Sequence, residues 1–83
     1  MYTTSRYASM KTRELAKKLA EENKEIYMAR GKKTIDQLAQ FARKKGEHKI
    51  TILEDQETKP KIATITIDEL GQWKWSDLGD NRG

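Results

Sequence analysis

The chain has 83 residues, which is enough for one compact domain with a modest core and too few for a second. It contains no cysteine, which excludes a disulfide framework, a zinc site built from thiolates and a cysteine nucleophile. No apolar run approaches the roughly 20 residues that span a bilayer. Residues 1–4 show no apolar signal-peptide core, so we predict a cytoplasmic protein.

Positive charge is concentrated in the first half of the chain. Residues 1–49 hold 13 of the 17 Lys and Arg but only 6 of the 13 Asp and Glu, a net charge of +7, which leaves −3 for the rest. This distribution is typical of a protein that binds a polyanion. The alternative is that Lys and Glu only solvate the helix faces, as in many heat-stable proteins.

The first half predicts a strand, a helix and a second strand. Residues 2–5 are mostly β-branched or aromatic and indicate a short strand. A helix is predicted over residues 10–22, with Ser9 as its N-cap. Residues expected on one face of this helix recur at helical spacing: Thr12, Leu15, Ala16 and Leu19. Residues 25–29 indicate a buried strand, and residues 30–33 form a basic loop.

The second half predicts a helix followed by strands. Thr34 and Gln37 have the spacing of a capping box, so a second helix should run from Thr34 to about Ala42. Its expected apolar stripe consists of Ile35, Leu38, Ala39, Phe41 and Ala42. Residues 49–53 and 61–67 predict an antiparallel hairpin, and a last strand is possible at residues 72–75.

The order β-α-β-α-β-β predicts an α/β fold of the α+β type, with two helices packed on a mixed sheet of four to five strands. We expect one domain over residues 1–76 and a flexible polar tail over residues 77–83.

Residue types suited to catalysis are scarce. His48 is the chain's one histidine, and its charged neighbours indicate a surface or strand-edge position. The acidic run at residues 54–57 could attract a hard cation, but it lacks the Gly of a calcium loop, and a solvated turn is the favoured interpretation. We therefore predict no enzyme, no metal site and no cofactor.

Two features could contact nucleic acid. Gly31-Lys32-Lys33-Thr34 resembles a phosphate-binding loop, but the first Gly of that motif would fall at Ile26, so nucleotide hydrolysis is not predicted. A helix start preceded by Arg30, Lys32 and Lys33 still suits a nucleic-acid phosphate. Trp73 and Trp75 would share one face of a strand, where they could stack on unpaired bases, close the core or form an interface.

The opening string Thr3-Thr4-Ser5-Arg6, followed by Ser9, Thr12-Arg13 and residues 16–19, resembles the start of the Brix domain of ribosome-biogenesis proteins in archaea and eukaryotes. Arg30-Gly31 before a capped helix resembles that family's Arg-Gly turn, and residues 50–54, Pro60 and residues 62–67 follow its next two strands. A Brix domain is about twice as long, with two related halves similar to anticodon-binding domains, so this chain would correspond to the N-terminal half.

The resemblance implies binding to ribosomal RNA or pre-ribosomal particles. Its candidate positions are Thr4, Ser5, Arg6, Arg13, Arg30 and Gly31, although Gly31 could equally serve a turn that needs positive φ. We add Lys11, Lys32 and Lys33 for their charge. A missing half would be replaced by a second copy, giving a homodimer, or by a partner protein. The rival hypothesis is a protein-interaction module whose docking surface is formed by Trp73 and Trp75.

Overall fold

The computed structural model describes residues 1–55 and 61–76. Its elements are β1 (Tyr2–Thr4), α1 (Met10–Glu22), α2 (Ile35–Lys44), β2 (Lys49–Glu54), β3 (Lys61–Ile67) and β4 (Trp73–Trp75). They confirm the predicted fold class of two helices and a mixed sheet, here with four strands. The turn that ends at Pro60 and the predicted tail at residues 77–83 lie outside the described residues.

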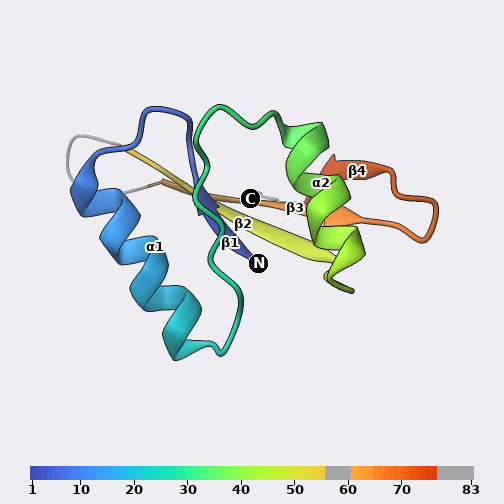
Figure 1. The fold of residues 1–83 in the computed structure, drawn as a ribbon, viewed down its shortest axis with the longest axis horizontal. Coiled ribbons are helices and arrows are strands. Elements are labelled where there is room, and N and C mark those ends of the chain that lie inside the picture. Colours follow the sequence, from blue (N-terminus) through green and yellow to red (C-terminus); the bar gives the residue numbers. More distant parts are fainter. Residues whose placement is uncertain (56–60, 77–83) are drawn as a thin grey trace, which may run out of the picture.

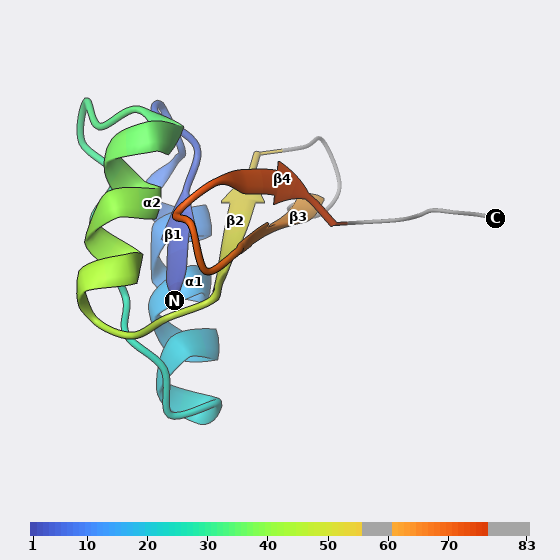
Figure 2. The same ribbon diagram turned by 90° about the vertical axis from the view of Figure 1, so that its right-hand side faces the viewer.

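The strands lie in the order β1-β2-β3-β4 (Figure 1). β1 is parallel to β2, with Tyr2 beside Thr51 and Thr4 beside Leu53. The predicted hairpin is confirmed, since β3 runs antiparallel to β2, and the last strand β4 runs antiparallel to β3. Figure 2 shows α2 on one side of the sheet, and a hydrogen bond from the indole N–H of Trp73 to Asp36 connects this helix to β4.

The two helices cover opposite faces of the sheet, since side chains alternate between faces along each strand. On one face, α2 forms the main core with Met1 and four isoleucines of the sheet: Ile50, Ile52, Ile65 and Ile67. Thr51 and Leu53 point to the other face. Tyr2 shares that face, since it is paired with Thr51, and its hydroxyl accepts a hydrogen bond of 3.2 Å from Asn23 at the end of α1.

Both helix starts are capped as predicted. The Ser9 hydroxyl accepts from the backbone N–H of Thr12, which satisfies a donor that the first turn of α1 leaves open. Thr34 and Gln37 form the reciprocal capping box of α2. The buried positions of α1 are small: Thr12, Ala16 and Ala20. This helix can therefore approach the sheet closely.

The buried strand predicted at residues 25–29 is wrong in extent. The N–H of Tyr2 donates to the carbonyl of Ile26 at 2.7 Å, and the N–H of Met28 donates to the carbonyl of Tyr2 at 2.8 Å, which leaves one bridge between Tyr2 and Tyr27. Ile26 is 37% exposed. The reason is position, since this segment lies outside β1, and a strand of three residues offers few partners.

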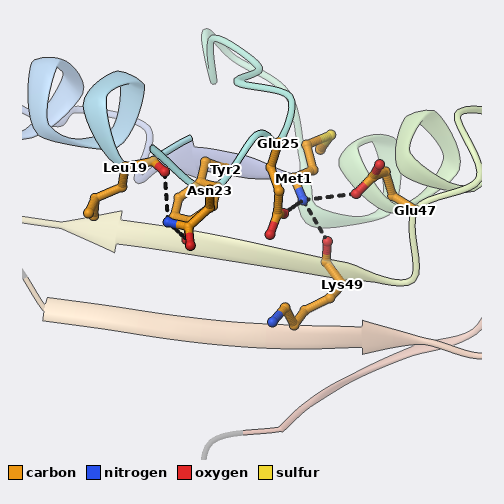
Figure 3. A network of polar contacts seen from close by, with 7 residues as sticks. All are labelled: Met1, Tyr2, Leu19, Asn23, Glu25, Glu47 and Lys49. Atoms are coloured by element: carbon orange, nitrogen blue, oxygen red, sulfur yellow. Dashed lines mark hydrogen bonds and ion pairs between the residues drawn. The ribbon is translucent and has the colours of Figure 1, made fainter. Parts of the chain in front are cut away.

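The amino group of Met1 is buried in a polar network near the start of β1 (Figure 3). It contacts the carboxylate of Glu25 at 2.7 Å and that of Glu47 at 3.2 Å, and it donates to the carbonyl of Lys49 at 3.0 Å. These contacts connect the segment before Tyr27, the end of α2 and the start of β2. A charge inside the protein needs such partners, because its water shell has been lost.

Candidate nucleic-acid interface

Six of the nine predicted RNA-contacting residues line one hollow of about 250 Å³, which we call the basic hollow. Its lining residues are Thr4, Ser5, Arg6, Ala8, Arg13, Tyr27, Ala29, Arg30 and Gly31. They come from the end of β1, the loop before α1, the first turns of α1 and the segment that precedes α2. Figure 1 shows this loop, in dark blue, beside the green segment that leads to α2.

Arg30 belongs to the floor of the basic hollow and is 9% exposed. Its Nε–H donates to the carbonyl of Lys33 at 2.8 Å, and one terminal nitrogen donates to the carbonyl of Thr4 at 2.9 Å. Burial lowers the pKa of Arg30, the positive charge of Arg6 lowers it further, and Glu54 acts in the opposite direction. Arg30 therefore joins the turn at residues 30–33 to β1, and its charge reaches the surface only in part.

The turn after Arg30 has the conformation that a glycine allows. Gly31 has φ +54°, and a Cβ placed there would meet only the Nζ of Lys33 within 4 Å, at 3.9 Å. The backbone angle, and not crowding, therefore explains this glycine. Lys33 turns back to donate to the carbonyl of Ala29 at 3.3 Å, whereas Lys32 is exposed and does not line the hollow.

Arg6 and Arg13 supply the accessible charge. Both side chains are exposed and line the basic hollow from two sides, one from the loop and one from α1. Lys11 is also exposed but does not line the hollow. Thr4 is buried, and its hydroxyl donates to the carbonyl of Ser5 at 3.1 Å, so its part is to shape the end of β1.

Tyr27 is a lining residue that the sequence pattern did not single out. It is half-buried, and the ammonium of Lys17 lies 5.7 Å from its ring centroid. Burial raises the pKa of Tyr27, while the charge of Arg13 lowers it. The sequence predicted Tyr27 as part of a buried strand and therefore gave no functional signal for it. Its neighbours in space belong to α1, and the spacing of residues along the sequence could not show this.

Asp55 has a structural role that its position in the acidic run at residues 54–57 did not predict. Its carboxylate accepts from the N–H of Ser9 at 2.9 Å, from the Ser9 hydroxyl at 3.1 Å and from the hydroxyl of Thr12. The Thr12 hydroxyl is the main reason why the pKa of Asp55 lies below its ordinary value, and the two Ser9 donors add to it. The end of β2 thus anchors the start of α1 beside the basic hollow.

The tryptophans lie away from the basic hollow, on the face that α2 covers. Trp73 packs against the main core and its indole N–H donates to the carboxylate of Asp36. Trp75 is 49% exposed and meets Trp73 edge to face at 6.1 Å between ring centroids. Of the three uses considered for Trp73, closing the core is the one that the contacts match.

Among residues 1–55 and 61–76, no group of three or more His, Cys, Asp or Glu could hold a metal ion. His48 is exposed at the start of β2, and its carbonyl accepts from the N–H of Ile67 at 2.9 Å. Within the same residues, no helix has the length and apolarity needed to cross a membrane.

The sequence matches no protein-family model, and no curated protein matches it. Among solved structures, the crystal structure of Mil (Mth680), an archaeal Imp4-like protein, superimposes with a TM-score of 0.67 and 25% sequence identity. This chain is similar to an archaeal Imp4-like protein. The match covers 87% of this chain and 45% of that one, so the chain spans less than half the length of the protein it resembles.

Proposed function

We propose that this chain is a Brix-like RNA-binding module that acts on ribosomal RNA or pre-ribosomal particles in the cytoplasm, by binding and not by catalysis. The observation that carries the proposal is the convergence of Arg6, Arg13 and Arg30 on one hollow. Two further observations support it: the opening residues resemble the Brix domain, and the fold is similar to that of an Imp4-like protein.

The basic hollow suits a phosphate backbone for electrostatic reasons. Arg6 and Arg13 are exposed and can pair with phosphate oxygens, while the partly buried Arg30 adds positive potential from below. Each phosphate that such residues neutralise releases condensed counterions, so the affinity should fall steeply with salt. Contacts of this kind hold the RNA without reading its bases.

The test is an anisotropy titration with ribosomal RNA fragments at several salt concentrations. Arg6→Ala combined with Arg13→Ala should weaken binding and reduce the steepness of the salt dependence by about two phosphate contacts. Arg30 is left intact, because its backbone hydrogen bonds make a loss of binding ambiguous.

A matched control removes two positive charges elsewhere. Lys44→Ala with Lys45→Ala changes the exposed end of α2, on the other face of the sheet, and should leave the salt dependence close to that of the unmodified chain. If both double variants lost the same amount of RNA affinity, binding would depend only on the net charge of the protein. That result would count against the basic hollow as the binding site.

A second surface supports association with another chain. On the face covered by α1, β3 extends beyond the helix and leaves Ile62 54% exposed in register with buried Leu53. We propose that a second copy of the chain, or a partner that carries a related half domain, covers this region. Sedimentation that gave a well-folded monomer of 9.6 kDa at micromolar concentration would oppose the homodimer.

One observation supports the protein-interaction hypothesis. Trp75 is half-exposed, and it lies on β4 at the end of the strand order. An apolar docking surface of this kind would bind with little dependence on salt, unlike a phosphate contact. A partner whose affinity is insensitive to salt and depends on Trp75 would therefore favour this alternative over RNA binding.

A further inference from the structure

A second hollow continues the basic hollow along α1. It measures about 280 Å³ and is lined by Met10, Arg13, Glu14, Lys17, Tyr27 and Ala29. Three of these residues, Arg13, Tyr27 and Ala29, also line the basic hollow. The two hollows therefore adjoin, and together they form a groove between α1 and the segment that precedes α2, with Tyr27 at the junction.

The groove combines charge with an aromatic surface. Arg6 and Arg13 line the first hollow, and Arg13 and Lys17 line the second. Among the described residues that line either hollow, Glu14 is the one acid. The ring of Tyr27 already attracts a cation, since the Lys17 ammonium lies 5.7 Å from its centroid. Lys17 is exposed, so its side chain can leave the ring for a phosphate.

Proteins that hold unpaired nucleotides combine these two features, a basic groove that follows the backbone and aromatic rings on which bases stack. A duplex keeps its bases stacked on one another, and it offers such a ring no free base. We infer that the groove takes single-stranded RNA, with one unpaired base stacked on Tyr27 and the flanking phosphates held by Arg6, Arg13 and Lys17. This inference rests on the proposed RNA-binding function and specifies the class of RNA.

The experiment compares two probes, a single-stranded RNA of about ten nucleotides, within the usual length of such sites, and the duplex of the same sequence. Tyr27→Leu removes the aromatic surface and keeps the apolar bulk, whereas Tyr27→Phe keeps the ring. Tyr27→Leu should weaken single-strand binding about 5- to 150-fold, the range that corresponds to the loss of one stacking contact. Tyr27→Phe should bind like the unmodified chain, and duplex binding should be weaker and unaffected by either change.

Tyr7 provides the matched control. It is 89% exposed, lies beside Arg6 and lines neither hollow. Tyr7→Leu should therefore leave single-strand affinity unchanged. The same loss in Tyr7→Leu and Tyr27→Leu would overturn the assignment of the groove, because it would show a general effect of surface aromatic residues.

A second measurement, an NMR titration, uses the unmodified chain and so does not depend on whether a variant folds. In the unmodified chain, a base stacked on Tyr27 should shift the ring-proton resonances of that residue during titration with the single strand, while those of Tyr7 stay in place. Equal affinity for both probes, with Tyr27 resonances unmoved, would overturn the inference and leave the RNA-binding proposal standing. Absence of binding to either probe at low salt would overturn the proposed function itself, and the inference with it.

Discussion

The two faces of the sheet are built from different side chains. The face under α2 is covered by large apolar residues, with Leu38, Ile50 and Ile65 fully buried. The face under α1 holds Tyr2, Thr4 and Thr51 beside the fully buried Leu53, and the helix that covers it contributes Thr12 and two alanines. Most of the large buried apolar side chains thus lie on one face, while the other face combines Leu53 with polar groups and carries the groove at its rim.

This division explains how a small chain can combine a core with a polar site. Apolar area is limited in a chain of 83 residues, and placing most of it under one helix gives a single cooperative core. The opposite face can then contain threonines and arginines at a modest cost, since their polar groups find backbone partners.

The largest expected effect on stability comes from removing a buried side chain of α2. Leu38→Ala should lower the free energy of unfolding by about 2–5 kcal/mol, because it removes a fully buried side chain and leaves a cavity. The matched change Leu15→Ala on α1 affects a half-buried leucine outside the main core and should cost less. Urea unfolding followed by circular dichroism measures both, and equal losses would contradict the unequal division of the core.

A smaller effect is expected at Arg30, on the other face. Arg30→Gln should lower the free energy of unfolding by about 1.5–3 kcal/mol, the range for hydrogen bonds to a charged group, because the carbonyls of Thr4 and Lys33 lose their donors. Arg30→Lys keeps the charge but cannot reach both carbonyls as a planar fork does. It should restore only part of the stability, and full rescue by Lys would show that charge alone matters.

Local patterns predicted most of the elements, because their signals lie within a few residues. Ser9, Thr34 and Gln37 marked both helix starts through capping chemistry, and the β-branched residues within 61–67 marked β3. The predicted strand at residues 25–29 failed because β1, its partner in space, is only three residues long. Sequence composition does not report how many hydrogen-bonding partners a segment will find.

The sequence indicated the arginines of the candidate site but not the contacts that surround them. Arg6, Arg13 and Arg30 carried the expected charge, but the burial of Arg30 depends on the carbonyl of Thr4, which is 26 positions away. Tyr27 and Asp55 were missed for the same reason, since their partners lie on α1 and in the loop before it. Only the packing of α1 against the sheet brings these groups together.

The smallest expected effect is a pH dependence at Asp55. Its carboxyl has a lower pKa in the folded chain than the ordinary value of 3.8, chiefly because the Thr12 hydroxyl donates to it, so the ionised form binds the start of α1 more tightly than the protonated form. This contribution to stability is therefore complete above the ordinary pKa and is lost as the pH falls through the lower folded value.

Asp55→Asn should lower the midpoint of thermal unfolding at neutral pH, because the amide accepts fewer hydrogen bonds from Ser9 and Thr12. The difference between the two proteins should shrink as the pH falls below about 4, where the carboxyl is protonated in the unfolded chain. Lys61→Gln, an exposed change at the start of β3, serves as the control and should show no such convergence. A difference that stayed constant from neutral to acid pH would mean that Asp55 anchors α1 through shape, without its charge.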